Sequence, residues 1–314
     1  MTLDPDCQKV HELYALAGRP PLETLTPAEA REGYLRGSAL LGPDPAEVGE
    51  IRNLVAQGPA GDIPLRLYRP KGTSADAVLP AMVFFHGGGW VIGDLETHDR
   101  LCRQLCNESG VAIVAVHYRL APEHVFPACV DDAFAATQWI ATNAAALRID
   151  ARRLAVGGDS AGGNLSAVVS LMARDAKGPS LRLHVLIYPA VDFRMNSASF
   201  TTRGDVLPLT KQAVKWFGDH YLGKTAGAVD DWRASPIRAA SLAGLPPAHV
   251  ITAGYDVLCD EGRAYADALE KAGVAVERAH FPGMIHGFIT MGRIVKAADT
   301  AIAGCAAALK RALA

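Results

Sequence analysis

The stretch Leu154-Ala155-Val156-Gly157-Gly158-Asp159-Ser160-Ala161-Gly162-Gly163-Asn164 is a short apolar run that breaks into glycines around one serine. The pattern Gly158-x-Ser160-x-Gly162 lets a strand turn sharply into a helix, because glycines stand where side chains would collide. We therefore expect a nucleophile elbow that projects the Ser160 hydroxyl into solvent. The helix that follows, over residues 164–172, would direct its N-terminal amides at negative charge forming beside the serine, which acyl transfer requires.

Glycine and serine are also ordinary turn residues, so this five-residue pattern with two free positions is weak evidence alone. The strand before it and the helix after it are the context that the motif requires. A serine in a plain loop would have no use for a base and an oxyanion hole elsewhere in the chain. The remaining sequence therefore decides between the two interpretations.

Composition bounds the classes of function. The chain has 314 residues, half of them apolar and a fifth charged, which is enough for one large core or two smaller ones. A formal charge of -2 and a pI near 6.5 provide no basic face for nucleic acid and no polybasic anchor for lipid. The longest apolar runs, such as residues 111–116, are far shorter than the ~20 residues of a membrane span. Because the N-terminus has no basic-then-apolar signal region, we expect a cytoplasmic protein that does not bind membranes.

Six cysteines are scattered along the chain rather than spaced as a disulfide framework. Cys102 and Cys106 would share one helix face, but two thiols without a nearby histidine pair do not form a zinc site. The sequence therefore predicts buried reduced thiols and no metal.

The first fifty residues have the pattern of two helices. Apolar residues fall at helical spacing over residues 10–17, and Thr26-Pro27-Ala28-Glu29 combines an N-cap threonine, an early proline and a capping glutamate. Leu35, Leu40 and Leu41 are expected to extend the apolar face. Helices that precede any strand are not needed to build a sheet, so we expect residues 1–48 to form a helical cap, the alternative being a stabilising extension.

From residue 50 onward, strand patterns lead into a repeated alternation of strands and helices. Strands are predicted at residues 51–55, 65–69, 81–85, 111–117, 154–158, 181–188, 248–253 and 274–281. Helices are predicted at residues 98–109, 128–147, 161–176, 260–272 and 293–313. This alternation predicts an α/β fold with a mostly parallel central sheet and helices on both faces.

The alternation lapses between residues 190 and 236. Residues 192–205 are polar and loop-like, and residues 210–221 form an amphipathic helix that carries Trp216 and Phe217. A long apolar insertion at this position indicates a lid over the carboxyl ends of the strands, or else a peripheral helix packed on the core. We expect one catalytic domain over residues 49–314, with this insertion adding to the cap.

A serine becomes a good nucleophile when a base takes its proton and a carboxylate orients that base. Asp256 and His286 each directly follow a predicted strand, which places both at the carboxyl edge where Ser160 also emerges. The order Ser, Asp, His along the chain is the one that this architecture, with a nucleophile elbow between strand and helix, uses. Asp260 competes with Asp256, but it can instead cap the helix that begins there.

The run His86-Gly87-Gly88-Gly89-Trp90 follows a predicted strand, and consecutive glycines let backbone amides approach a carbonyl oxygen. Gly88, Gly89 and Ala161 are the expected oxyanion donors. A phosphate-binding loop is the alternative, but the spacing fits neither nucleotide motif and no lysine follows.

Taken jointly, five motifs resemble those of the bacterial hormone-sensitive-lipase-like carboxylesterases. These are residues 86–89, Tyr118-Arg119-Leu120-Ala121-Pro122-Glu123, residues 158–163 and the segments around Asp256 and His286. The resemblance implies an α/β-hydrolase fold and a serine esterase without a cofactor that prefers short or medium acyl chains. It also supports Asp256 as the acid. Trp90 and Val257 depart from the residues commonest in the family, Phe or Tyr and Pro.

The expected reaction is attack of Ser160 on an ester, followed by hydrolysis of the acyl-enzyme by water. The pocket walls are expected to include Trp90, Tyr188, Leu207, Trp216 and Phe217. An amidase, lactonase or deacetylase on the same triad stays open, and a non-catalytic small-molecule receptor is the second alternative. The last predicted strand could lie at a sheet edge and pair with a second copy, giving a homodimer.

Overall fold

The protein is built on one eight-stranded sheet, and its structure, a computed structural model, describes residues 2–314. In spatial order the strands are β1 (Glu50–Gly58), β2 (Gly61–Arg69), β4 (Ala112–Val116), β3 (Leu79–Phe85), β5 (Ile149–Asp159), β6 (Leu181–Ile187), β7 (Ala248–Tyr255) and β8 (Val276–Ile285). Strand β2 runs antiparallel to both of its neighbours, and all other pairs are parallel. The predicted mostly parallel sheet is confirmed, and β8 lies at its edge.

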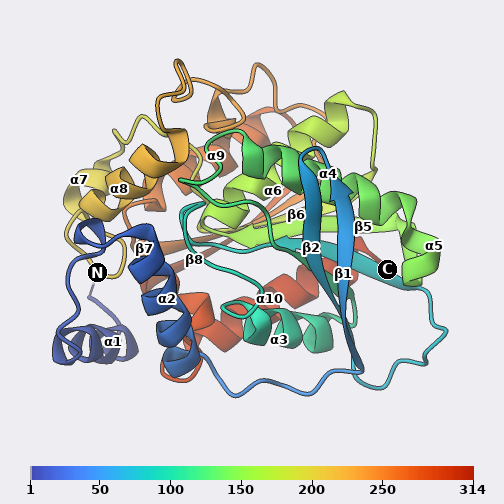
Figure 1. The fold of residues 1–314 in the computed structure, drawn as a ribbon, viewed down its shortest axis with the longest axis horizontal. Coiled ribbons are helices and arrows are strands. Elements are labelled where there is room, and N and C mark those ends of the chain that lie inside the picture. The colour runs from blue at the N-terminus through green and yellow to red at the C-terminus, as the bar shows by residue number, and fades with distance from the viewer. Residues whose placement is uncertain (1) are drawn as a thin grey trace.

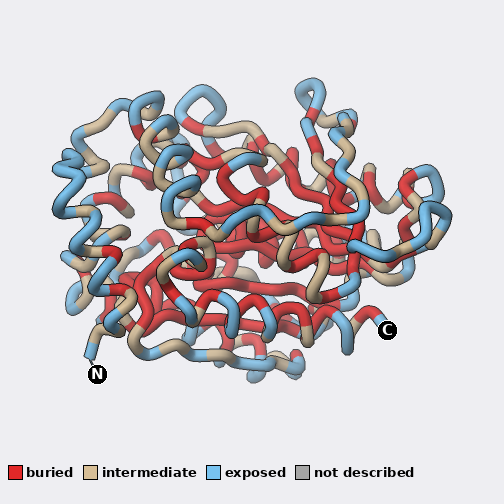
Figure 2. The backbone as a smooth tube through the Cα atoms, turned by 90° about the horizontal axis from the view of Figure 1, so that it is seen from below, coloured by how far each residue is buried: buried red, intermediate tan, exposed pale blue. Residues whose placement is uncertain are grey.

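Helices cover both faces of the sheet (Figure 1). One face packs against α3 (Asp99–Ser109) and α10 (Ala297–Ala312), and the other against α4 (Ala128–Thr142), α6 (Ala161–Asp175) and α9 (Cys259–Lys271). In β3, Val83 belongs to the apolar cluster under α4 and α6, whereas its neighbour Phe84 belongs to the cluster under α3 and α10. Burial of both faces explains why the central strands are apolar without alternation. Figure 2 shows the resulting buried layer through the middle of the molecule.

Three predicted elements differ from the structure. The predicted helix 128–147 is interrupted at Asn143, which has φ -96° and ψ 12°, and a short α5 (Ala144–Leu147) follows α4 and ends at the left-handed Arg148. The closing helix begins at Ala297 instead of residue 293, since the Arg293 amide donates to the Leu41 carbonyl. The predicted loop 192–205 contains a short helix, α7 (Ala198–Thr202), whose N-terminus is capped by the Ser197 side chain.

The N-terminal helices α1 (Pro5–Leu16) and α2 (Pro27–Leu41) lie at one end of the sheet, with η1 (Leu22–Thr24) between them (Figure 1). The capping box predicted at Thr26 and Glu29 is confirmed. The apolar face predicted to extend through Leu35, Leu40 and Leu41 is wrong at Leu35 and Leu40, which are 41% and 66% exposed, but Leu41 packs against the core. Helix α2 contacts the body of the protein through the buried Ala30 and also through polar groups.

Arg31 is the main polar link between α2 and the rest of the protein. Its guanidinium donates to the carbonyls of Val91 at 2.8 Å and Ala121 at 2.9 Å. It also forms a bidentate pair with Glu123 at 2.6 and 2.7 Å. Glu123 belongs to the segment 118–123 that the sequence singled out, and this segment therefore joins the N-terminal helices to the chain after the glycine loop.

The insertion after β6 contributes α7 and α8 (Lys211–Leu222), which lie near α1 and α2 in Figure 1. The backbone then passes through η2 (Pro236–Arg238) to β7, and η3 (Phe288–Thr290) follows β8. The His11 side chain contacts the Leu207 carbonyl at 2.8 Å, so α1 meets the insertion directly. The two segments predicted to form a cap thus lie at the same end of the sheet.

Candidate active site

Ser160 occupies the turn between β5 and α6 in a strained conformation, with φ 56° and ψ -116°. Positive φ is rare for a residue other than glycine, and such strain clusters at functional sites. A Cβ on Gly158 or on Gly162 would collide with the Phe85 carbonyl. The two glycines are therefore required by the close approach of β3, as the elbow pattern predicted.

The structure brings Ser160, Asp256 and His286 together. His286 Nε2 lies 2.9 Å from Ser160 Oγ, and His286 Nδ1 lies 2.7 Å from Asp256 Oδ2. A carboxylate only accepts hydrogen bonds, so Nδ1 carries the proton and Nε2 can accept from the serine hydroxyl. Asp256 is 1% exposed, and its other oxygen accepts the Leu258 amide at 2.9 Å. This geometry suits a serine nucleophile with a histidine base.

Asp260, the competing acid, forms hydrogen bonds with Ser199. Its carboxylate accepts the Ser199 amide at 2.8 Å, and the Asp260 amide in turn donates to the Ser199 hydroxyl at 3.1 Å. These reciprocal bonds attach α7 to the start of α9. The carboxylate beside His286 is that of Asp256, as the sequence favoured.

The expectation that the Ser160 hydroxyl projects into open solvent is wrong. Ser160 and His286 are each 9% exposed. They line a cavity of about 930 Å³ whose walls also come from the N-terminal helices and the insertion. Because the local motif says nothing of distant segments, the sequence around the elbow could not reveal this cover.

The glycine loop after β3 leaves free amides beside the serine. Gly88 and Gly89 have φ of 121° and 56°, which favour glycine, and within residues 2–314 their amides have no hydrogen-bond acceptor. A Cβ on Gly89 would collide with the Phe217 ring. Ala161 is the first residue of α6, where no preceding turn supplies an acceptor. Gly88, Gly89 and Ser160 all line the cavity.

The predicted pocket walls are partly correct. Trp90, Leu207 and Phe217 line the cavity, but Tyr188 and Trp216 do not. Tyr188 is buried beneath it, with its ring 4.7 Å from the imidazole of His286, so it supports the base. Trp216 packs against the rings of Phe217 and His220 on α8.

Other wall residues were missed by the sequence analysis. They are large side chains from three separate segments: Tyr34, Phe193, Leu209 and Met291. Phe193 lies five residues after Tyr188, and Met291 lies five residues after His286; both Tyr188 and His286 are predicted site residues. Phe193 also lies in the insertion predicted as a lid, so its position in the sequence carried two signals, and Met291 carried only its proximity to His286.

Buried charges around the cavity have shifted pKa values. Burial raises the pKa of the Glu261 carboxyl to about 8, although the amides of Val191 and Asp192 donate to it. Burial also lowers the pKa of His86 to about 3, so this histidine of the glycine loop is neutral. Glu261 lines the cavity, and within residues 2–314 its carboxylate forms no hydrogen bond with the triad.

All six cysteines are buried with free thiols, as predicted. Within residues 2–314, no cluster of three or more His, Cys, Asp or Glu side chains has the arrangement of a metal site. Over the same residues, no helix combines the length and apolarity that crossing a membrane requires.

Comparison with known proteins gives consistent matches. A family described as having the alpha/beta hydrolase fold matches residues 82–290. The chain is 42% identical to the carboxylic ester hydrolase LipN of Mycobacterium tuberculosis over 92% of this chain and 78% of that one. It is 38% identical to the ethyl acetate hydrolase of Pseudomonas putida, over 99% of each chain. Among solved structures, the ester hydrolase EH1AB1 from the metagenome of Lake Arreo has a TM-score of 0.95 and 43% identity, over 99% of both chains.

Proposed function

As a member of the α/β-hydrolase-fold family, with esterases as relatives over nearly its whole length, the chain is a carboxylic ester hydrolase, and we propose that Ser160 is its nucleophile. The single observation that carries this proposal is the chain of contacts from Ser160 Oγ through His286 to Asp256, at 2.9 and 2.7 Å. Such a series of contacts from serine through histidine to a carboxylate activates a hydroxyl that is otherwise a weak nucleophile.

The reaction proceeds in two acyl transfers. Ser160 Oγ bonds to the ester carbonyl carbon while His286 Nε2 takes its proton, and the Asp256 carboxylate stabilises the imidazolium. The carbonyl oxygen becomes an oxyanion that accepts hydrogen bonds from the amides of Gly88, Gly89 and Ala161. When the intermediate collapses, the bond to the alkoxy oxygen breaks and His286 returns the proton to the departing alcohol.

Water then hydrolyses the acyl-enzyme by the same series of steps. The water oxygen bonds to the acyl carbon while His286 takes its proton, and when the bond between the acyl carbon and Ser160 Oγ breaks, His286 returns that proton to Oγ. The products are a carboxylic acid and the free serine. No group outside the chain, the ester and water is needed to balance these steps.

The substrates proposed are esters with short to medium acyl chains. A cavity of about 930 Å³, with Trp90, Leu207 and Phe217 among its walls, supports a substrate that is enclosed on several sides. Rates on p-nitrophenyl esters from acetate to palmitate test this point. The proposal predicts a maximum at the shorter chains, and a maximum at palmitate would contradict it.

Replacing Ser160 by alanine tests the nucleophile. We expect turnover of p-nitrophenyl acetate to be lost while the unfolding midpoint stays close to that of the wild type. A fluorophosphonate should label the wild type at Ser160 and leave the variant unlabelled. Ser166, which is also buried and lies on α6, offers a control in Ser166→Ala, which should keep both activity and labelling. Unchanged turnover in Ser160→Ala would end the proposal.

The proposal includes a cytoplasmic location and a homodimer. Six buried free thiols support a reducing compartment. Strand β8 lies at the sheet edge, where backbone groups can pair with β8 of a second copy. Light scattering after a sizing column tests the dimer, and a monomer at micromolar concentration would contradict it.

A further inference from the structure

Asp159 directly precedes Ser160, and its side chain contacts the glycine loop rather than the triad. Asp159 Oδ1 accepts the Gly87 amide at 2.9 Å and lies 3.1 Å from His98 Nε2. Both side chains are buried, Asp159 at 3% and His98 at 1% exposure. The residue beside the nucleophile therefore also holds the segment that carries the free amides of Gly88 and Gly89.

The glycine loop is fixed on both sides of Gly88. A Cβ on Gly87 would collide with the Asp159 carboxylate, so the backbone of Gly87 lies directly against it. One residue later, the Gly88 carbonyl accepts the amides of Val91 at 3.1 Å and Ile92 at 2.9 Å. Between these two attachments, the direction of the Gly88 and Gly89 amides follows from the position of Gly87.

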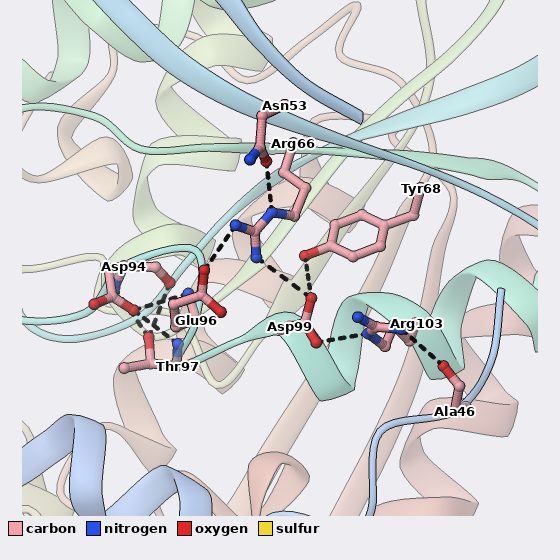
Figure 3. A network of polar contacts seen from close by, with 9 residues as sticks. All are labelled: Ala46, Asn53, Arg66, Tyr68, Asp94, Glu96, Thr97, Asp99 and Arg103. Atoms are coloured by element: carbon pink, nitrogen blue, oxygen red, sulfur yellow. Dashed lines mark hydrogen bonds and ion pairs between the residues drawn. The ribbon is translucent and has the colours of Figure 1, made fainter. Parts of the chain in front are cut away.

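His98 is itself held from both flanks. Its Nδ1 lies 2.9 Å from Thr97 Oγ1, and Thr97 exchanges hydrogen bonds with Asp94. On the other side, the Asp99 carboxylate accepts from Tyr68 at 2.9 Å and Arg103 at 2.6 Å. Figure 3 shows the contacts of the two residues that flank His98 in the chain, those of Thr97 with Asp94 and those of Asp99 with its partners. The imidazole is thus held with Nε2 3.1 Å from the Asp159 carboxylate.

The charge of Asp159 agrees with this arrangement. Burial alone would raise its pKa, but His98 and the Gly87 amide outweigh burial and lower it. The carboxylate is therefore ionised at neutral pH, and hydrogen bonds to an ionised acceptor are shorter and stronger than neutral ones.

We propose that Asp159 and His98 are positioning residues, which hold the Gly87 peptide so that the next two amides face the oxyanion formed at Ser160. This inference rests on the proposed function. Neither side chain touches the reacting atoms, so both act through the backbone of the loop. Because oxyanion donors work through being fixed before the reaction, loosening their support weakens binding of the transition state more than binding of the substrate.

Two variants of similar size, Asp159→Asn and His98→Gln, break the contact between carboxylate and imidazole. We expect kcat for p-nitrophenyl acetate to fall about 10- to 100-fold in each, with KM nearly unchanged, because loss of a whole oxyanion donor costs about 10²- to 10³-fold. A trifluoromethyl ketone, which forms a tetrahedral adduct with the serine, should lose affinity by the same factor as kcat. The corresponding trifluoromethyl alcohol, which forms no adduct, should bind as before.

Asp132→Asn is the matched control. Asp132 is also buried, accepts a backbone amide, that of Arg119 at 3.0 Å, and pairs with a cation, the Arg119 guanidinium at 2.7 Å. This variant should lose stability yet keep kcat and the affinity for the ketone.

The inference is overturned if folded Asp159→Asn and His98→Gln behave like the control, losing stability but neither kcat nor ketone affinity. Should Asp159→Asn not fold, His98→Gln and Thr97→Val decide by the same measurements, since both variants leave the Asp159 carboxylate itself in place. Failure of the proposed function is a separate outcome, because the wild type would then neither hydrolyse the ester nor bind the ketone more tightly than the alcohol.

Discussion

Replacing Glu261 by glutamine should make the protein progressively more stable than the wild type as the pH rises. Glu261 Oε1 accepts the amides of Val191 at 2.7 Å and Asp192 at 3.3 Å. A glutamine oxygen can accept the same two bonds without carrying a charge. The substitution therefore removes the cost of ionising a buried carboxyl and retains the hydrogen bonds that fix the chain after β6.

The size of the effect follows from the pKa. Burial raises the pKa of Glu261 from 4.5 to about 8, so the folded protein keeps a proton that the unfolded chain releases. The stability of the wild type then falls as the pH rises through this window and levels off above it. Each pKa unit corresponds to about 1.4 kcal/mol. Between pH 5 and pH 8, the wild type should lose about 3 kcal/mol that the variant keeps.

Urea unfolding at several pH values between 5 and 8 measures this difference. Glu270→Gln is the control, because Glu270 is an exposed carboxylate on the same helix, paired with Arg278. That substitution should change the free energy of unfolding by a similar small amount at every pH. If the curves for Glu261→Gln and the wild type run parallel across the window, Glu261 ionises normally in the folded protein and the reasoning is refuted.

Three further predictions concern the site and its support. Gly89→Ala should reduce kcat on p-nitrophenyl acetate about 100-fold, because its Cβ would collide with the Phe217 ring at a residue with φ of 56°; a rate within twofold of the wild type would contradict the assigned donor. Asp256→Asn should reduce kcat about 10⁴-fold through the wrong histidine tautomer, measured by steady-state kinetics on folded enzyme. Arg31→Met should lower the free energy of unfolding by about 1–2 kcal/mol and speed proteolysis within residues 5–41, because two carbonyls and a carboxylate lose their donor. Arg36→Met, which breaks an exposed pair on the same helix, should have neither effect.

The elbow and the glycine loop could be predicted because close packing of their backbones permits only glycine at certain positions. A Cβ at Gly158 or Gly162 collides with the backbone of β3, and Gly89 requires a positive φ beside a packed ring. Only glycine satisfies steric demands of this kind, so the residue type itself indicates them. The motif therefore carried information about three-dimensional contacts that its own short span does not contain.

The walls and the cover of the cavity could not be predicted in the same way. Helical periodicity indicates an apolar stripe, but not which segment will pack against it, and Leu35 and Leu40 stay 41% and 66% exposed. Size and position favour Tyr188 and Trp216 as wall residues, yet Tyr188 packs under His286 and Trp216 packs against His220 of its own helix. These outcomes depend on how α1, α2 and α8 meet over the strand ends, which is a tertiary property.

The meeting of Asp256 and His286 depends on an irregular register that their sequence positions do not reveal. Ala253 pairs with Phe281, but Tyr255 pairs with Ile285, so β8 uses four residues where β7 uses two. A regular register would pair Tyr255 with residue 283 and carry His286 about 7 Å beyond its present place opposite Asp256. The bulge is accommodated because Gly254 has no Cβ to collide with the Pro282 carbonyl, and because the Gly283 carbonyl accepts the Asp4 amide at 3.0 Å. The N-terminal segment therefore contacts the same bulge that places the base beside its carboxylate, which links the first residues of the chain to the geometry of the triad.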